Sequence, residues 1–134
     1  MIRIGMFGYG VVAQGLTKAL RTSRHENIEI RKVCVKSGNK KRDLDPTILT
    51  TDENDIWLDP DVNVIVELID DSSAAFKIAR KAYEAGLPFI SANKKMIAEN
   101  IVVLHDWIEN GFQFRYEGAV GGSIPIFHSI EHFY

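Results

Sequence analysis

Short apolar runs alternate with amphipathic stretches along most of this 134-residue chain. Apolar or alternating runs predict strands at residues 3–8, 28–35, 62–69, 87–91 and 112–116. Apolar residues at helical spacing predict helices at residues 12–22, 72–85 and 94–111, the last interrupted near Asn100. Strands that alternate with helices in this way are typical of βαβ units. The pattern therefore predicts an α/β fold with a Rossmann-type, doubly wound and mainly parallel sheet that carries helices on both faces.

Turn and cap residues mark the ends of these elements. The polar segment 36–43 has no apolar period and predicts a loop. Asp71 and the two serines after it are candidate N-cap residues, and Gly86 stands where a left-handed residue ends a helix. Between the two Asp-Pro turns of the chain, a short strand is predicted at 48–51 and a short helix at 55–58.

The composition is that of one ordinary globular domain, with 46% hydrophobic and 25% charged residues. The net charge is −2, so the chain has no overall basic field to hold nucleic acid or an anionic membrane. No apolar run approaches the roughly 20 residues that cross a bilayer, and the first residues lack the features of a secretion signal. The single cysteine, Cys34, has no intrachain partner, and we expect it to be a small core residue. We expect a cytoplasmic protein.

A glycine-rich turn follows the first predicted strand and opens the first predicted helix. It consists of Gly8, Tyr9, Gly10, Val11, Val12 and Ala13. These residues match the G-x-G-x-x-G/A pattern of dinucleotide-binding folds, in which the glycines permit a tight turn and a close approach of the backbone to the pyrophosphate. The helix start then offers free N–H groups and a positive dipole end to the anion. We therefore predict that these six residues bind a dinucleotide; the competing interpretation is a purely structural glycine turn.

The residues after the second predicted strand favour a phosphorylated ribose. In NAD-preferring sites an Asp or Glu about 20 residues after the glycines binds the ribose 2′-hydroxyl. Here the strand leads into Lys36 and Ser37, and Lys40, Lys41 and Arg42 follow. Positive charge at this point attracts a 2′-phosphate. We predict contacts from Lys36, Ser37 and Arg42 and a preference for NADP(H) over NAD(H); the alternative is a solvated basic loop.

Three later segments are more specific than the glycine turn. They are Asp-Pro-Asp-Val-Asn-Val-Ile-Val-Glu-Leu-Ile at 59–69, Ser-Ala-Asn-Lys-Lys-Met-Ile-Ala at 91–98, and Tyr-Glu-Gly-Ala-Val-Gly-Gly-Ser-Ile-Pro-Ile at 116–126. With the glycine turn, they make the chain resemble, over essentially its whole length, the N-terminal nucleotide-binding domain of homoserine dehydrogenase. Members of that family are oxidoreductases that reduce L-aspartate 4-semialdehyde to L-homoserine with NAD(P)H, in the biosynthesis of threonine, methionine and isoleucine.

The resemblance assigns chemistry to the segment that begins at Ser91. This segment lies at the carboxyl end of a predicted strand, the edge at which open α/β sheets bind ligands. Lys94 matches the lysine that the family places beside substrate and nicotinamide and treats as catalytic, and an ammonium group there can stabilise the developing alkoxide. Ser91, Asn93 and Lys94 are therefore expected to contact the cofactor. Without the resemblance, Lys94 would be interpreted as a surface lysine at a helix start.

A cation site is implied near the end of the chain. Glu117 follows a predicted strand and precedes a glycine-rich turn, where a carboxylate and carbonyl groups can converge on a hard cation. The family has a structural monovalent-cation site that matches Glu117 and the carbonyl groups of Val120, Gly122 and Ile124. The alternative is that Glu117 caps the backbone amides of the turn.

The resemblance also defines departures and open alternatives. Asp70 and Asp71 stand where the family has two glycines, which places two carboxylates close to the expected nucleotide. Family members continue into a second domain that binds the substrate and forms a homo-oligomer, so we expect residues 1–134 to be the dinucleotide-binding domain without the substrate and dimerisation domain, and to be inactive alone. The alternatives are a nucleotide-sensing regulatory module and the nucleotide domain of an aspartate dehydrogenase-like enzyme.

Overall fold

The structure is a computed structural model that describes residues 1–23 and 25–116. Its strands are β1 (Ile2–Phe7), β2 (Ile28–Cys34), β3 (Leu49–Thr50), β4 (Val64–Glu67), β5 (Phe89–Ser91) and β6 (Phe114–Arg115). Its α-helices are α1 (Val11–Thr22), α2 (Asn54–Trp57), α3 (Ser72–Ala85), α4 (Lys94–Glu99) and α5 (Ile101–Glu109), and a single 3₁₀ turn, η1, spans Pro46–Ile48. Every element predicted within these described residues is present within a few residues of its expected bounds.

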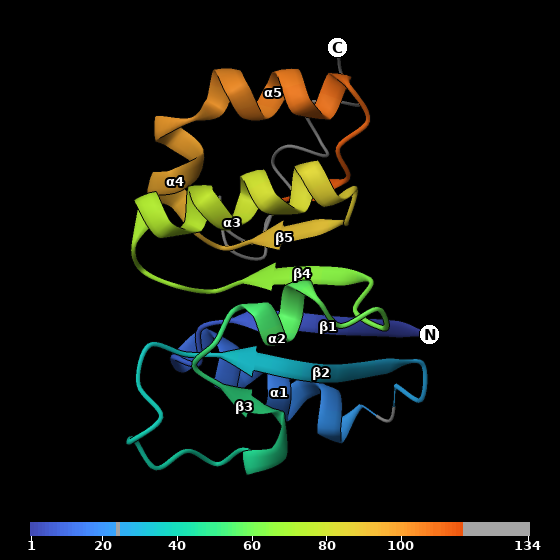
Figure 1. The fold of residues 1–134 in the computed structure, drawn as a ribbon, viewed down its shortest axis with the longest axis vertical. Helices are drawn as coiled ribbons and strands as arrows, with labels where there is room; N and C mark the ends of the chain where they lie inside the picture. The colour runs from blue at the N-terminus through green and yellow to red at the C-terminus, as the bar shows by residue number, and fades with distance from the viewer. Residues whose placement is uncertain (24, 117–134) are drawn as a thin grey trace.

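The six strands form one parallel sheet in the order β3-β2-β1-β4-β5-β6. The chain builds one half of the sheet outward from β1 to β3 and then crosses over to build the other half from β4 to β6 (Figure 1). This confirms the predicted doubly wound fold. The strand order reverses direction between β1 and β4, and an open α/β sheet binds its ligand in the crevice at that point, outside the carboxyl ends of the strands.

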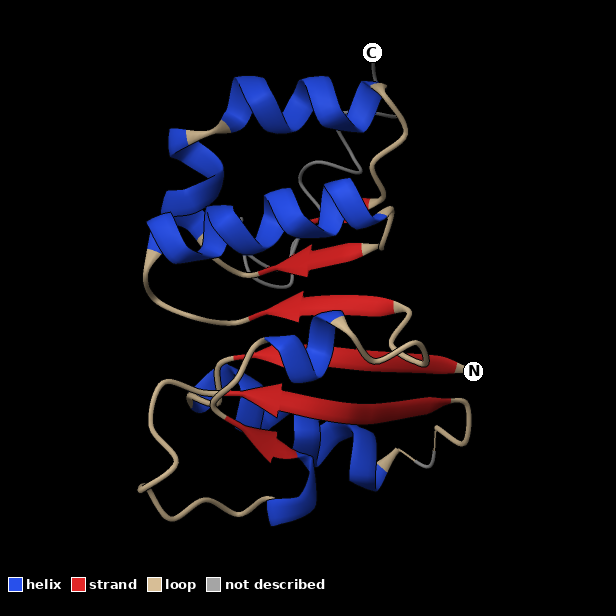
Figure 2. Cartoon of the chain, viewed as in Figure 1, coloured by secondary structure: helices blue, strands red, loops and turns tan. Residues whose placement is uncertain are grey.

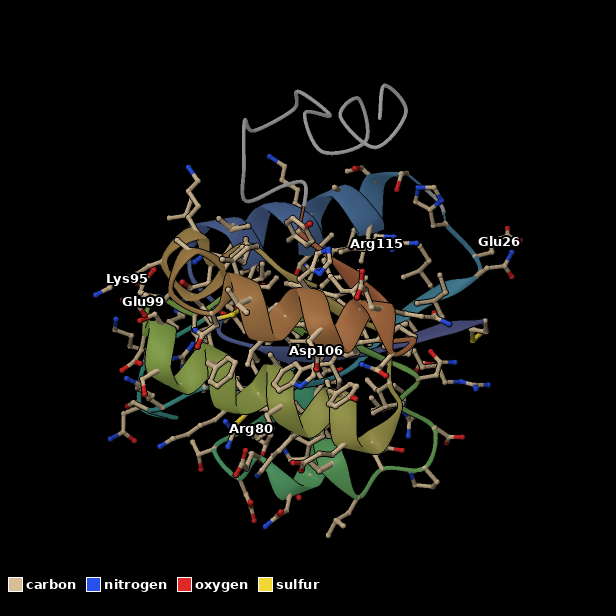
Figure 3. All side chains as sticks on the ribbon, turned by 90° about the horizontal axis from the view of Figure 1, so that it is seen from above. Glu26, Arg80, Lys95, Glu99, Asp106 and Arg115 are labelled. Carbon is tan, nitrogen blue, oxygen red and sulfur yellow. The ribbon has the colours of Figure 1, made fainter. Side chains whose placement is uncertain are left out.

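Helices cover both faces of the sheet (Figure 2). Seen from above, α1 lies on one side of the sheet and α2 and α3 lie on the other (Figure 3). On the α1 side the buried side chains of Ile4, Met6, Val33 and Val66 pack around Ala13. On the α3 side a larger buried cluster surrounds Phe89 and is extended by aromatic residues of α3 and α5.

Aromatic stacking fixes α5, and with it α4, to the rest of this larger cluster. The ring of Trp107 on α5 stacks on Phe76 and on Tyr83 of α3, with centroid separations of 5.5 and 4.8 Å. Offset stacking of this kind adds roughly 0.5–1.5 kcal/mol per pair beyond the burial of apolar area. The short helix α4 is therefore held between two anchored helices.

The ends of the elements follow the predicted signals. Asp71 is the N-cap of α3, and Gly86 ends that helix in the left-handed conformation with φ of +68°. Asn100 separates α4 from α5 as expected. The strand predicted at 62–69 is shorter, since β4 ends at Glu67, whose own side chain bends the following backbone by accepting a hydrogen bond from the Ile69 N–H.

Candidate dinucleotide-binding cleft

A cleft of about 1150 Å³ opens at the carboxyl ends of β1, β2 and β4. Its walls are the glycine turn, residues 34–36 at the end of β2, residues 68–71 after β4, and one face of α3. The residues of the predicted turn that line it are Gly8, Tyr9, Gly10, Val11 and Val12. The cleft therefore lies where the reversal of strand order requires a ligand site.

Glycine occurs at the two positions of the turn for different structural reasons. Gly8 has φ of +91°, and a Cβ there would lie 2.8 Å from both the Leu68 carbonyl oxygen and Ile69 Cγ2. Gly8 is thus required by the fold of the chain itself. Gly10 has an ordinary φ of −84°, and a Cβ there would meet no atom of the described chain within 4 Å. The space in front of Gly10 is open and fits a group that approaches the backbone closely, as a pyrophosphate does.

The start of α1 is suited to an anion. Gly10 is the N-cap and supplies no side-chain cap, and the first turn carries no acidic residue. Val11 and Val12 are 87% and 60% exposed at the mouth of the cleft, whereas Ala13 is fully buried against the sheet. The first turn of the helix therefore has no side-chain cap, and its N–H groups are available to an anion, which is the usual arrangement at a phosphate-binding helix start.

The charge of the cleft is positive although the chain as a whole is negative. Among the described residues, the charged groups that line it are Lys36, Lys40, Arg42, Lys77 and Lys81 against Glu53, Asp70 and Asp71. Lys36 and Arg42 are where the sequence places them, and no carboxylate follows β2 directly. Ser37 does not line the cleft, so its predicted contact with the cofactor stays a prediction.

The loop after β2 is held beside the cleft by Tyr9. Its hydroxyl donates to the Asp43 carbonyl oxygen at 3.0 Å, and Arg21 of α1 forms an ion pair with the Asp43 carboxylate at 3.5 Å. Both contacts join α1 and its glycine turn to the basic loop. The lysines of that loop are therefore held near the end of β2, where a ribose 2′-phosphate is expected.

Sequence reasoning missed the wall formed by α3 and by Glu53, the N-cap residue of α2. Lys81 Nζ donates to Glu53 Oε1 at 2.7 Å, and Trp57 Nε1 donates to Glu53 Oε2 at 3.1 Å. The hydrogen bonds from Lys81 and Trp57 lower the pKa of the Glu53 carboxyl against the opposing effect of its partial burial. No local motif marks this group, because Lys81 of α3 meets Glu53 and Trp57 of the α2 segment only in the folded chain.

The two aspartates that follow β4, Asp70 and Asp71, have different surroundings. The Oδ1 of Asp71 accepts the Ala74 N–H at 2.8 Å and caps α3, and this hydrogen bond is the main reason that the pKa of Asp71 is lowered. The positive charges of Lys36 and Lys77 lower it further. Asp70 lines the cleft directly. The expectation that Asp71 serves as a cap is confirmed, so one of the two carboxylates is explained by the fold.

Cys34 differs from its expected place. It is partly exposed and lines the cleft, so it is not a closed core residue. Its partial burial and, to a lesser extent, the nearby carboxylates of Glu53, Asp52 and Asp55 raise the pKa of the thiol. The reason is its position as the last residue of β2, at the edge that the cleft opens. A thiol held neutral in this way is a poor nucleophile.

A second group of polar residues lies beyond the cleft, at the ends of β4 and β5. The Glu67 carboxylate is fully buried and accepts hydrogen bonds from the Ile69 N–H at 2.6 Å and the Ser91 hydroxyl at 2.5 Å. Burial raises the pKa of Glu67, and these two hydrogen bonds oppose that effect. Ser91 and Asn93 are 2% and 7% exposed and hydrogen-bonded within the chain. Their predicted contact with the cofactor remains a prediction.

Lys94 is the first residue of α4, directly after its N-cap Asn93. It is exposed and lies at the same carboxyl edge of the sheet as the cleft, although it is not among the residues that line the cleft. The predicted cation ligands Glu117, Val120, Gly122 and Ile124 lie outside the described residues. Within residues 1–23 and 25–116, no group of three metal-ligating side chains occurs, and no helix is long and apolar enough to cross a membrane.

An open parallel sheet with a glycine turn at its switch point, a helix start free for an anion and a basic cleft defines a nicotinamide dinucleotide-binding domain of the Rossmann type. A sequence model described as "Homoserine dehydrogenase, NAD binding domain" matches residues 8–116. The chain belongs to this family.

Relatives and solved structures agree with this assignment. The chain is 31% identical to homoserine dehydrogenase of Bacillus subtilis over 97% of its length, and 32% identical to that of Synechocystis over 93%. A crystal structure of a homoserine dehydrogenase from Thiobacillus denitrificans superposes with a TM-score of 0.84 over 98% of this chain at 28% identity. A Staphylococcus aureus structure gives 0.80 over 93% at 30% identity.

The chain spans about a third of these proteins: 32% and 31% of the two relatives, and 33% and 34% of the two solved chains. The match places the chain on their dinucleotide-binding part. Neither the nucleotide-sensing module nor the aspartate dehydrogenase-like enzyme is favoured by these matches.

Proposed function

We propose that this chain is the cofactor-binding part of a homoserine dehydrogenase, which reduces L-aspartate 4-semialdehyde to L-homoserine with NAD(P)H. The observation that carries the proposal is the basic cleft at the switch point, with the open space before Gly10 and the uncapped start of α1. In this proposal the substrate and dimerisation functions belong to the two-thirds of the relatives that the chain does not match, and the 134 residues alone bind cofactor without turnover.

Different residues of the chain bind the cofactor and act on the substrate. The backbone of Gly8 to Val12 holds the pyrophosphate, and the neighbouring cleft orients the dinucleotide along the carboxyl edge of the sheet. NAD(P)H supplies a hydride to the aldehyde carbon when it is bound. Lys94, at the start of α4, donates a hydrogen bond to the aldehyde oxygen, stabilises the charge that develops there and delivers the proton that the oxygen needs.

We infer a preference for NADP(H) from the charges at the end of β2. Lys36, Lys40 and Arg42 line the cleft there, and no carboxylate follows the strand to accept a ribose 2′-hydroxyl. A 2′-phosphate opposite these cations gains roughly 1–4 kcal/mol per close pair at partly exposed sites. Isothermal calorimetry with NADP⁺ and NAD⁺ at low and moderate salt tests this preference. Equal or tighter binding of NAD⁺ would show that the basic loop is merely solvated.

The proposal includes a structural monovalent cation held by Glu117 and the carbonyl groups of Val120, Gly122 and Ile124. The resemblance implies this cation, and it also implies a homo-oligomer. We propose a cytoplasmic location as well, which the single cysteine fits. Melting the chain in sodium chloride and in a salt of a large organic cation, at equal ionic strength, tests the cation. A melting temperature that does not distinguish the two salts would exclude a bound ion.

A domain exchange tests the activity. The matched segment of a homoserine dehydrogenase relative is replaced by this chain, and the oxidation of NADPH that depends on aspartate semialdehyde is followed by absorbance. We expect turnover in the exchanged protein and none in the 134-residue chain alone. A folded exchanged protein that binds NADPH without turnover would contradict the proposed function. The same protein carrying the relative's own segment is the control.

A further inference from the structure

A closed set of buried and partly buried hydrogen bonds joins the ends of β4 and β5 to the start of α4. Glu67 accepts from the Ser91 hydroxyl, and Ser91 Oγ in turn accepts the Asn93 N–H at 3.0 Å. Asn93 Oδ1 caps α4 by accepting the Met96 N–H at 2.9 Å, while its Nδ2 donates to the Ile69 carbonyl oxygen at 3.0 Å. Ile69 closes the circuit by donating its N–H to Glu67. Every side chain in the set is at most 7% exposed.

The direction of these hydrogen bonds requires an acceptor at both oxygens of residue 67. The Ile69 N–H can only donate, and the Ser91 hydroxyl already accepts from Asn93, so its hydrogen must find an acceptor elsewhere. An ionised carboxylate meets both demands. A glutamine keeps the shape but presents an NH₂ group to Ser91, which leaves the serine hydrogen without its partner.

A buried carboxylate is costly for a fold that needs only packing. Burial of an ionised group costs several kcal/mol before its hydrogen bonds are formed, and an apolar residue in the sheet avoids that cost. The strand neighbours Ile65 and Val66 are buried and apolar, as the core demands. Residue 67 therefore has a task that packing alone does not explain.

We connect residue 67 with Lys94, because the position of the Lys94 side chain depends only on the backbone of α4. Its side chain makes no hydrogen bond or ion pair within the described part of the chain. The neighbouring Lys95 instead pairs with Glu99 at 3.7 Å and points outward beside it (Figure 3). Only the first turn of α4 places Lys94, and the buried set fixes that turn through Asn93.

We propose that Glu67 is a positioning residue, which acts through Ser91 and Asn93 to fix the start of α4 and so hold Lys94 at the reacting edge of the sheet. The inference rests on the proposed function for the role of Lys94, but the mechanical coupling can be measured in the chain alone. We predict that a substitution at residue 67 weakens the hydrogen bond that caps α4 and leaves the hydrogen bond that caps α3 unchanged.

Amide hydrogen exchange measures this coupling at single residues. The Met96 N–H reports on the α4 cap, and the Ala74 N–H, which Asp71 caps in the same way, is the internal reference. We expect Glu67→Gln to speed exchange of Met96 by roughly tenfold, the effect of weakening one N-cap, and to leave Ala74 within about twofold. Glu53→Gln is the matched control, since the Glu53 carboxylate, like that of Glu67, accepts two hydrogen bonds but lies outside the set.

Acylation of the chain with acetic anhydride reports on Lys94 itself. Peptide mass spectrometry gives the rate at Lys94 relative to Lys95, which is 74% exposed in its side chain. We expect Glu67→Gln to change this ratio by at least about twofold, because the two lysines are held by different contacts. Glu53→Gln is expected to leave the ratio as it is in the unaltered chain.

Ser91 provides a second route if Glu67→Gln does not fold. Ser91→Ala removes the hydroxyl and is expected to speed Met96 exchange as Glu67→Gln does, whereas Ser91→Thr keeps the hydroxyl and is expected to restore the original rate. Equal acceleration at Met96 and Ala74, or no acceleration at either, would overturn the inference. Failure of the proposed function would show separately. In that case the domain-exchanged enzyme would keep its turnover when it carries Lys94→Ala, while Glu67→Gln would still speed amide hydrogen exchange at Met96 and not at Ala74.

Discussion

Alanine at Gly8 and at Gly10 is expected to have opposite effects on stability and on binding. At Gly8 the backbone has φ of +91°, and the new Cβ would lie 2.8 Å from a carbonyl oxygen and from Ile69 Cγ2. The left-handed strain costs about 1–3 kcal/mol and the overpacking a further ~1–3 kcal/mol. The Leu68 backbone is held in place, because the Leu68 N–H donates to the Phe7 carbonyl oxygen in β1. Gly8→Ala should therefore lower the free energy of unfolding by about 2–6 kcal/mol, a large part of the roughly 5–15 kcal/mol of an ordinary domain.

At Gly10 the same methyl group meets nothing in the described chain within 4 Å. The expected loss of stability is about 1 kcal/mol or less, the difference between glycine and alanine at an N-cap. The methyl group does occupy the space assigned to the pyrophosphate. Loss of one charge-assisted hydrogen bond is worth ~1.5–3 kcal/mol, so the Kd for NADP(H) should rise by roughly tenfold to hundredfold.

Urea unfolding followed by circular dichroism gives the stabilities, and quenching of tryptophan fluorescence by NADPH gives the affinities. Trp57 suits the titration because it donates to Glu53 on the cleft wall. Gly86→Ala is the control for strain alone, since Gly86 has φ of +68° with open space around its Cβ position. Tight binding by Gly10→Ala would refute the assignment of the pyrophosphate to this turn. A Gly8→Ala variant no less stable than Gly86→Ala would refute the role given to the contact with Leu68.

Three further outcomes are expected. Lys36→Glu should reverse the preference between NADP(H) and NAD(H) in calorimetric titrations, because it places an acid at the end of β2. In the exchanged enzyme, Lys94→Ala should lower kcat by about 10²-fold or more with nearly unchanged nucleotide affinity, measured by steady-state kinetics. Burial raises the pKa of the Glu67 carboxyl above its value in the unfolded chain, so the folded chain holds that proton more tightly. The free energy of unfolding therefore falls as the pH rises from the unfolded pKa of Glu67 through its folded pKa. Glu67→Gln should flatten this decline in urea unfolding measured over a series of pH values.

Local patterns were sufficient to predict most of the fold. Helical spacing and the signals at Asp71 and Gly86 placed α3 within its observed bounds, because each of them acts within one turn of chain. The boundary of β4 was misplaced for a physical reason: Leu68 and Ile69 are apolar like the strand, and only the hydrogen bond to the Glu67 side chain reveals that the backbone has turned.

The site was predictable only where its residues are neighbours in sequence. The glycine turn and Lys36 were predicted from a continuous stretch of sequence, in which the strands and the helix around them are predicted by the same pattern. The wall formed by Glu53 and Lys81 did not, because their separation of 28 positions is closed by the packing of α3 and α2 against the same face of the sheet. Cys34 was misjudged for a related reason, since apolar neighbours in sequence do not reveal that a strand ends at an open edge.

The positive charge of the cleft depends on the hydrogen bonds and ion pairs that its carboxylates make. Asp71 is committed to the cap of α3 and faces Lys36 and Lys77, and Glu53 is paired with Lys81. Asp70 is the carboxylate of the lining that has no such partner among the described hydrogen bonds and ion pairs. The cations of the loop after β2 therefore outweigh it where the ribose phosphate is expected, and Asp70 itself weakens the attraction by like charge. Replacing Asp70 with glycine should consequently tighten NADP(H) binding, and more at low than at high ionic strength. An affinity for NADP(H) that is unchanged in Asp70→Gly at low salt would mean that this carboxylate points away from the bound phosphates.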